Sequence, residues 1–221
     1  MKIQAVLFDI DGTLVDSNDA HVSAWQEAIA GVGVSLDRET IHGQVGKGAD
    51  NLLPALLPHA DETVREQARK AHADIFKQRY MPRVEPFAHA HDLLARVKQS
   101  GRRVVLASSA SQEELDHYLG LLDARALVSA TTSADDVAHT KPAPDIFACA
   151  LSKVPPVGAD AAVVVGDSPY DMEGARKCRI APVGLRSGKF GDGVLREAGA
   201  SALYDDVAAL LAQYDTSPLA Q

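Results

Sequence analysis

The sequence has little cysteine and lacks any long apolar run. Its 221 residues include only two cysteines, Cys149 and Cys178, whose spacing matches neither a metal-binding motif nor a disulfide framework. No apolar stretch is long enough to span a bilayer, and Asp9 interrupts the run near the N-terminus that could otherwise act as a secretory signal. These absences predict a cytoplasmic protein without a transmembrane segment.

Positive charge is also scarce, because 22 basic residues face 30 acidic ones and leave a net charge of -8. Nucleic acids and anionic membranes bind cationic surfaces, so we expect neither as a partner. A small anionic partner would need a few cations placed locally. The hydrophobic fraction of 46% predicts a folded chain with a sizeable core, and we expect a monomer or a weak homodimer.

The first apolar run ends in two carboxylates. Residues 5–8 read Ala-Val-Leu-Phe, and Asp9, Asp11 and Gly12 follow directly. This run predicts a strand buried on both faces, with a glycine loop at its carboxyl end, where parallel sheets bind their ligands. In an extended segment the side chains of Asp9 and Asp11 point the same way and can share one metal ion or one phosphoryl group. The alternative is a solvated acidic turn.

The pattern then becomes helical from residue 17 to residue 84. Val22, Trp25 and Ile29 recur at helical spacing after Ser17. Further helices are predicted over 36–45, 50–57 and 61–80, and no strand is predicted over 35–83.

From residue 86 onward, helices and strands alternate. Helices are predicted over 88–98, 112–119, 145–151, 171–178 and 207–214. Strands are predicted over 103–107, 127–131, 161–165, 180–185 and 202–204. This alternation predicts an α/β fold with a parallel sheet covered by helices on both faces. The tail from residue 215 is expected to be frayed.

Three later stretches carry polar groups that suit the same sheet edge. Ser108 and Ser109 follow the predicted strand 103–107, where hydroxyls bind phosphate or merely cap a helix. Lys141 precedes Pro142, so its backbone is held extended; it either serves a site or is exposed in a stiff loop. Asp167 and Asp171 follow the strand at 161–165, and Asp171 could also cap the next helix.

Together these stretches resemble the haloacid dehalogenase superfamily, specifically its helical-cap members of the phosphoglycolate phosphatase and β-phosphoglucomutase type. The matching motifs are Asp9-x-Asp11-Gly-Thr, Ser108 after an apolar strand, Lys141-Pro-x-Pro-Asp, and Gly-Asp167-Ser-x-x-Asp171. The resemblance implies a Rossmann-like three-layer core formed by residues 1–16 and 85–221, with residues 17–84 as a helical cap.

The resemblance also implies roles for these residues. Asp9 would attack phosphorus. Asp11 would act as acid and base, which needs a raised pKa and a side chain that points away from the metal. Mg²⁺ would be held by the Asp9 carboxylate, the Asp11 backbone carbonyl and Asp167, with Asp171 in support. Catalytic roles fall on Asp9, Asp11, Ser108 and Lys141. Substrate contacts are expected from Gly12, Ser17, His21, Lys47 and Ser109.

The implied function is Mg²⁺-dependent hydrolysis of a small phosphorylated metabolite, such as phosphoglycolate or a sugar phosphate. Three alternatives compete with it. A dehalogenase needs no second aspartate, so Asp11 argues against that activity. A phosphate-binding receiver module lacks a helical insertion. A hexose-phosphate mutase of the β-phosphoglucomutase type carries Glu-Asp where this chain has Gly166-Asp167.

Overall fold

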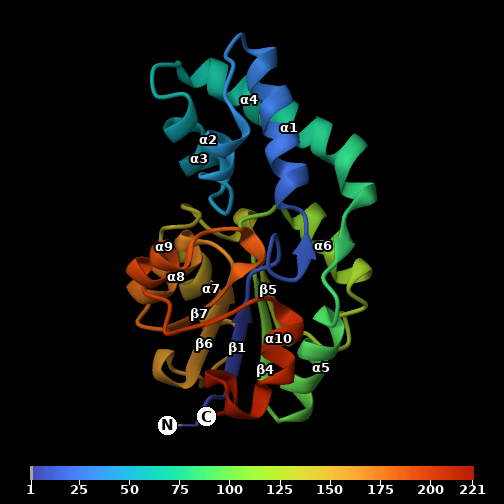
Figure 1. Ribbon diagram of the computed structural model, residues 1–221, viewed down its shortest axis with the longest axis vertical. Helices are drawn as coiled ribbons and strands as arrows, with labels where there is room; N and C mark the ends of the chain where they lie inside the picture. The colour runs from blue at the N-terminus through green and yellow to red at the C-terminus, as the bar shows by residue number, and fades with distance from the viewer. Residues whose placement is uncertain (1) are drawn as a thin grey trace.

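A six-stranded parallel sheet organises the lower part of the computed structural model, which describes residues 2–221 (Figure 1). The strands lie in the order β5-β4-β1-β6-β7-β8, and every neighbouring pair is parallel. Their bounds are β1 Ala5–Phe8, β4 Arg103–Ala107, β5 Ala130–Thr132, β6 Ala162–Gly166, β7 Ala181–Leu185 and β8 Ala202–Tyr204. The predicted α/β fold with a parallel sheet is confirmed.

The central strands β1 and β6 are apolar and buried along their whole length, because helices cover both faces of the sheet. Val6 and Phe8 of β1 belong to one core cluster, and Ala5 and Leu7 to the other. Side chains of α5, α6 and α10 share the first cluster, and those of α7 share the second. The helices of this part are α5 Ala90–Gln99, α6 Gln112–Leu121, α7 Asp145–Ser152, α8 Pro169–Lys177, α9 Asp192–Ala198 and α10 Val207–Ala212.

Two features of the C-terminal region differ from the prediction. Helix α9 was not predicted, because a glycine lies within its seven residues; Leu195 and Ala198 pack it against Met172 of α8. The expected frayed tail is wrong. Leu219 is fully buried, and the backbone N–H of Ile3 donates to the carbonyl of Gln221 at 2.7 Å, so the C-terminal residue lies beside the start of the described chain.

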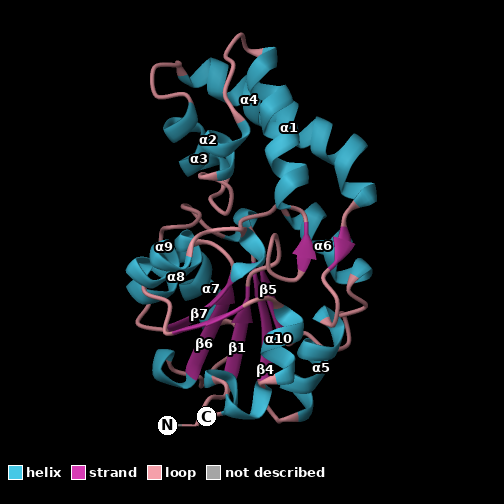
Figure 2. Ribbon diagram, in the orientation of Figure 1, coloured by secondary structure: helices cyan, strands magenta, loops and turns pink. Residues whose placement is uncertain are grey.

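The upper part of the molecule is helical and lies beyond the carboxyl ends of the strands (Figure 2). Its helices are α1 Asn18–Gly31, α2 Arg38–His42, α3 Ala49–Leu56 and α4 Glu62–Ile75, and a π-helical turn, Phe76–Tyr80, continues α4. They enclose a core of their own around Val22, Trp25, Ile29 and Ile41. The predicted helix over 36–45 is only five residues long in the structure.

Two short strands join the two parts. Strand β2, Val15–Asp16, pairs antiparallel with β3, Glu85–Pro86, where the chain leaves the sheet region and where it returns. Neither strand was predicted, since two residues carry no periodicity. Among the described residues, no helix combines the length and the apolar character needed to cross a membrane.

Candidate active site

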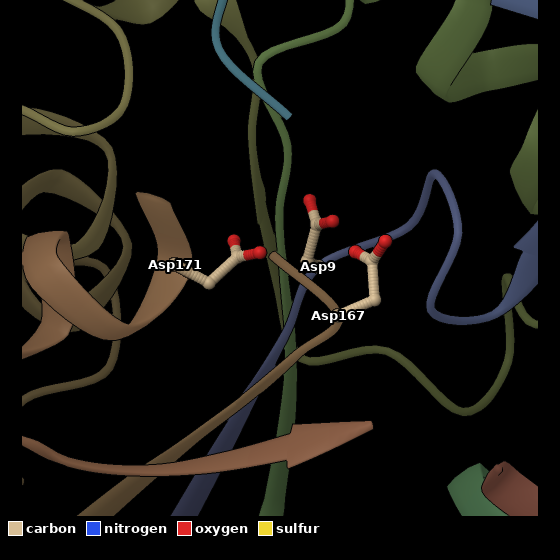
Figure 3. Close-up of side chains that lie close together, drawn as sticks. All are labelled: Asp9, Asp167 and Asp171. Atoms are coloured by element: carbon tan, nitrogen blue, oxygen red, sulfur yellow. The ribbon is translucent and has the colours of Figure 1, made fainter. Parts of the chain in front are cut away.

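Three buried carboxylates meet at the carboxyl edge of the sheet. Asp9 follows β1, Asp167 follows the neighbouring β6, and Asp171 lies in the first turn of α8. Each offers an oxygen within 4.8 Å of the others, and Figure 3 shows the carboxylates side by side. All three residues are at most 3% exposed. Parallel strands end at one edge, which explains how residues far apart in sequence come together.

Lys141 is the cation of this acidic cluster. Its Nζ lies 2.8 Å from Asp171 Oδ1 and also contacts Asp9 Oδ1, and its side chain is only 1% exposed. Burial disfavours the ammonium, but the charges of Asp171 and Asp9 outweigh burial and raise the pKa of Lys141. Lys141 is therefore a fixed positive charge, and the alternative of an exposed lysine in a stiff loop is excluded.

One lysine does not balance three carboxylates. Burial and the charge of Asp171 raise the pKa of Asp9 well above its ordinary value. The same two causes raise the pKa of Asp167 to about 7, although Asn18 and Thr13 donate hydrogen bonds to it at 2.8 and 3.0 Å. Closely spaced oxygen donors with excess negative charge are what a hard divalent cation binds. The residues present thus fit a magnesium ion.

Gly12 makes the close packing around Asp167 possible. Its φ is +73°, and a Cβ at this position would lie 2.2 Å from both Asp167 Oδ2 and Asn18 Nδ2. Its backbone N–H donates to the carbonyl of Val15 at 2.8 Å and is not free to bind a ligand. This geometry favours a packing role for Gly12 over the expected substrate contact.

We therefore expect Gly12→Ala to be strongly destabilising, measured as the free energy of unfolding in urea. Gly33→Ala is the matched control, because Gly33 has a φ of +84° and open space where a Cβ would lie. The control should lose about 1 kcal/mol from backbone strain, and Gly12→Ala a further 1–3 kcal/mol or so from overlap. If the two variants lose the same free energy of unfolding, Asp167 and Asn18 move away from the new Cβ without destabilising the protein, and the prediction is wrong.

Asp11 does not share the carboxylate cluster with Asp9. Its Oδ1 accepts a hydrogen bond from Ser17 Oγ at 2.6 Å and lies 3.1 Å from His21 Nε2. The expectation from strand alternation that the two aspartates point the same way is wrong, because strand β1 ends at Phe8 and the extended alternation ends with it. The Asp11 side chain lies outside the carboxylate cluster, as its expected acid/base role requires. Among residues 2–221, the cluster that could hold a metal ion contains Asp9, Asp167 and Asp171 only.

The expected raised pKa of Asp11 is also wrong. Burial raises it, but the charge and hydrogen bond of His21, together with the Ser17 hydroxyl, lower the pKa of Asp11 to about 2. Burial lowers the pKa of His21, yet the charge of Asp11 outweighs this and raises it. Asp11 and His21 therefore form a hydrogen-bonded pair in which each side chain favours the charged form of the other. Ser17 is fully buried behind Asp11, so it holds Asp11 in place and does not face a substrate.

The two serines after β4 differ in their surroundings. Ser108 is fully buried, and its Oγ accepts the backbone N–H of Ala110 at 3.0 Å. Ser109 Oγ is buried and has no hydrogen-bond partner among the described residues. The N-cap of α6 is Ser111, which forms a capping box with Glu114. Ser108 is therefore not the helix cap that was its alternative interpretation.

A cavity of about 480 Å³ separates these groups from the helical part. Of the predicted residues, those lining it are Asp9, Asp11, His21, Lys47, Ser109 and Lys141. The other predicted residues, Gly12, Ser17, Ser108, Asp167 and Asp171, do not line it. In this pocket the Lys141 ammonium and the Ser109 hydroxyl can bind an anion, and the Asp9 carboxylate lies beside them as a nucleophile.

Lys47 reaches this cavity from the loop before α3. Its Nζ donates to Gln44 Oε1 at 2.6 Å and lies 4.7 Å from the centre of the Tyr170 ring. Burial lowers the pKa of Lys47, and Glu173 opposes this. The side chain therefore presents a partly desolvated cation to whatever occupies the cavity.

Sequence reasoning missed the residues that hold the site together. Thr13 and Asn18 bind Asp167, and Thr13 could have been found from its place in the Asp11-Gly-Thr motif. Thr140, next to Lys141, accepts the backbone N–H of Gly48 at 3.0 Å and donates its own N–H to Asp50 at 3.0 Å. No local pattern indicates this contact, which ties the helical part to the Lys141 loop.

Comparison with known proteins agrees with this fold and site. A family model described as haloacid dehalogenase-like hydrolase matches residues 6–185, and the chain belongs to this family. A plasmid phosphoglycolate phosphatase of Cupriavidus necator is 32% identical over 225 residues, covering 98% of this chain and 95% of that protein. The fructose-1-phosphate phosphatase YqaB of Escherichia coli is 28% identical, covering 84% and 97%.

A solved structure has the same fold as this protein. The crystal structure of a hydrolase from Pseudomonas syringae superposes with a TM-score of 0.90 at 30% identity, covering 96% of this chain and 98% of that one. The resemblance predicted from the motifs is confirmed, and the protein is a phosphatase of the haloacid dehalogenase-like type.

Proposed function

We propose that the protein hydrolyses a small phosphomonoester, phosphoglycolate or a sugar phosphate, through an aspartyl-phosphate on Asp9, with Mg²⁺ as cofactor. One observation carries this proposal: the Asp9 carboxylate, paired with Lys141, lies at the floor of a cavity that Asp11 and His21 also line. The relatives that act on phosphoglycolate and on fructose 1-phosphate support the substrate class.

Asp9 is the nucleophile in this proposal. Attack of its carboxylate on phosphorus expels the alcohol, and water then hydrolyses the acyl phosphate, so one difficult hydrolysis becomes two easier steps. Lys141 offsets the charge of the incoming phosphoryl oxygens. Mg²⁺, bound by Asp9, Asp167, Asp171 and the Asp11 backbone carbonyl, would supply further positive charge there.

The leaving oxygen receives its proton from the Asp11–His21 pair. His21 Nε2 lies 3.1 Å from Asp11 Oδ1, so a proton on this nitrogen is one short transfer from the carboxylate. A developing alkoxide is far more basic than either group, and the low pKa of Asp11 therefore does not prevent donation. In the second step, the same pair accepts a proton from the attacking water.

Ser109, which lines the cavity, binds a phosphoryl oxygen in this proposal, and Ser108, buried outside the cavity lining, is a second hydroxyl at the same strand end. Ser109 contributes a buried hydroxyl that has no hydrogen-bond partner among residues 2–221. Ser108 Oγ retains a donor proton, because the hydrogen bond it accepts from Ala110 uses only a lone pair.

Residues 17–84 form the cap in this proposal, and residues 1–16 and 85–221 form the core. The β2–β3 pair lies at both crossings and suits a hinge. Lys47 approaches the leaving group from the cap, and its cation suits a second anionic group such as the carboxylate of phosphoglycolate. Closure over the substrate excludes water from the acyl phosphate until the alcohol has left.

A mutase is the less favoured function. Mutases of the β-phosphoglucomutase type carry glutamate at the position of Gly166. Here a Cβ on Gly166 would lie 2.5 Å from both Cβ and Cγ of Asp171. A glutamate would have to displace Asp171, so the site is packed for glycine. A phosphate-release screen over a panel of phosphomonoesters with Mg²⁺, run beside a glucose 1-phosphate isomerisation assay, tests this choice.

We expect Asp11→Asn to slow hydrolysis of alkyl phosphates by roughly a hundredfold or more, because the alkoxide then leaves without a proton. An aryl phosphate has a good leaving group and should lose far less in its first step. Single-turnover release of alcohol and of phenol, measured at equal enzyme concentration, gives both rates. Equal losses on the two substrates would assign Asp11 a structural role only.

A further inference from the structure

A second histidine, His72 of α4, contacts His21 and also lines the cavity. His21 lies between two partners, with Nε2 3.1 Å from Asp11 Oδ1 and Nδ1 3.4 Å from His72 Nε2. The contact joins α1 to α4, which pack side by side in the helical part (Figure 1). The two histidines are 51 positions apart, so no sequence motif indicates the pair.

Aromatic stacking fixes the planes of both imidazoles. The His21 ring stacks on Phe76 with centroids 3.9 Å apart and planes 11° apart. The His72 ring stacks on Trp25 with centroids 3.8 Å apart and planes 10° apart. The stacked neighbours hold each imidazole in its plane. A half-turn about the Cβ–Cγ bond keeps that plane but exchanges the positions of ring nitrogen and ring carbon. Stacking alone does not choose between the two orientations of His21.

Hydrogen bonding makes that choice. With His21 as observed, both of its nitrogens have partners, whereas a half-turn would present carbon to Asp11 and to His72. At 3.4 Å, His21 Nδ1 and His72 Nε2 can form a hydrogen bond in which either ring donates, because an imidazole nitrogen donates when it is protonated and accepts when it is not. A phenyl ring at position 72 would keep the stack on Trp25 but would leave His21 Nδ1 without a partner.

We propose that His72 is a positioning residue: its Nε2 holds His21 in the orientation that keeps His21 Nε2 against Asp11. This inference rests on the proposed function, because it assigns His72 to the proton transfer at the leaving oxygen. It predicts that losing the His72 nitrogen harms only the steps that use Asp11.

The experiment compares His72→Phe, which keeps the stack, with His72→Gln, whose amide can restore a polar contact to His21. His59→Phe is the matched control, since His59 is an exposed histidine of the same helical part. Each variant is assayed for kcat and KM on an alkyl phosphate that the wild-type protein hydrolyses, and for single-turnover release of phenol from an aryl phosphate. Thermal unfolding establishes that each variant is folded.

We expect His72→Phe to lower kcat on the alkyl phosphate about tenfold, the effect of one lost hydrogen bond, with KM and the aryl rate almost unchanged. His72→Gln should recover part of kcat, and His59→Phe should match the wild type. In an Asp11→Asn background the His72→Phe loss should vanish, because residues acting as one unit are not additive.

Several outcomes would overturn the inference. A rise in KM at constant kcat would make His72 a substrate-binding residue. An equal loss on both substrates, or the same loss in the Asp11→Asn background, would make it structural. If His72→Phe does not fold, the same comparisons are made with His72→Gln, alone and combined with Asp11→Asn. A loss of alkyl kcat that disappears in the Asp11→Asn background supports the inference, and a loss that persists there overturns it. A wild-type protein that hydrolyses no phosphomonoester would instead refute the proposed function.

Discussion

Asp9→Asn is expected to abolish phosphatase turnover, with kcat reduced by roughly four orders of magnitude or more, as when a catalytic nucleophile is removed elsewhere. An amide cannot attack phosphorus. The fold should survive, because asparagine has the same shape and removes a carboxylate whose ionised form is disfavoured by burial and by Asp171. Lys141 keeps Asp171 as a partner.

The measurement combines steady-state phosphate release with intact-mass analysis of acid-quenched protein. Wild-type protein mixed with substrate should carry a covalent phosphate, and Asp9→Asn should carry none. Asp160→Asn is the control for the loss of one negative charge, because Asp160 is exposed and belongs to no part of the site. Rapid turnover by a well-folded Asp9→Asn variant would exclude Asp9 as the nucleophile.

Removal of divalent cations is the second change expected to stop the reaction. Asp9, Asp167 and Asp171 place three buried carboxylates beside a single lysine, and a phosphate dianion adds more negative charge to the same place. Without a cation, repulsion should hold the substrate away from Asp9, so excess EDTA should reduce activity to background. Added Mg²⁺ should restore it, and Ca²⁺, which prefers longer and more flexible coordination, should restore it poorly.

Binding of the cation can be measured apart from activity. Mg²⁺ relieves repulsion within the folded protein only, so it should raise the melting temperature of the wild-type protein in proportion to its occupancy. In Asp167→Asn, the Thr13 and Asn18 side chains keep hydrogen-bond partners at position 167, but one charged ligand is lost. The stabilisation by Mg²⁺ should then shrink. Full activity in excess EDTA would refute the metal requirement.

Much of the fold and part of the site follow from the sequence alone. The runs around Val6, Val104 and Val163 are strands because covered parallel sheets need apolar residues on both faces, and the helices between them show their own periodicity. Parallel strands end at one edge, so the acids after β1 and β6 had to meet there. These features depend on local pattern and on one topological rule, and both are visible in a single chain.

Side-chain direction at the site was decided by tertiary structure. Asp11 lies past the end of β1, where no alternation rule applies, and its direction depends on Ser17 and His21. Its low pKa has the same origin, because the His21 side chain reaches it from another element, helix α1. Gly12 is required by Asp167, a residue from the far end of the chain.

The remaining surprises share this cause. Helix α9 and the buried tail around Leu219 are too short to show a period, and they are ordered by the surfaces they cover. His72 has the pattern of an ordinary helix residue until α4 packs on α1 and sets its Nε2 against His21. The sequence by itself determined which groups gather at the sheet edge; contacts between distant segments decided which way each group points and which charge it carries.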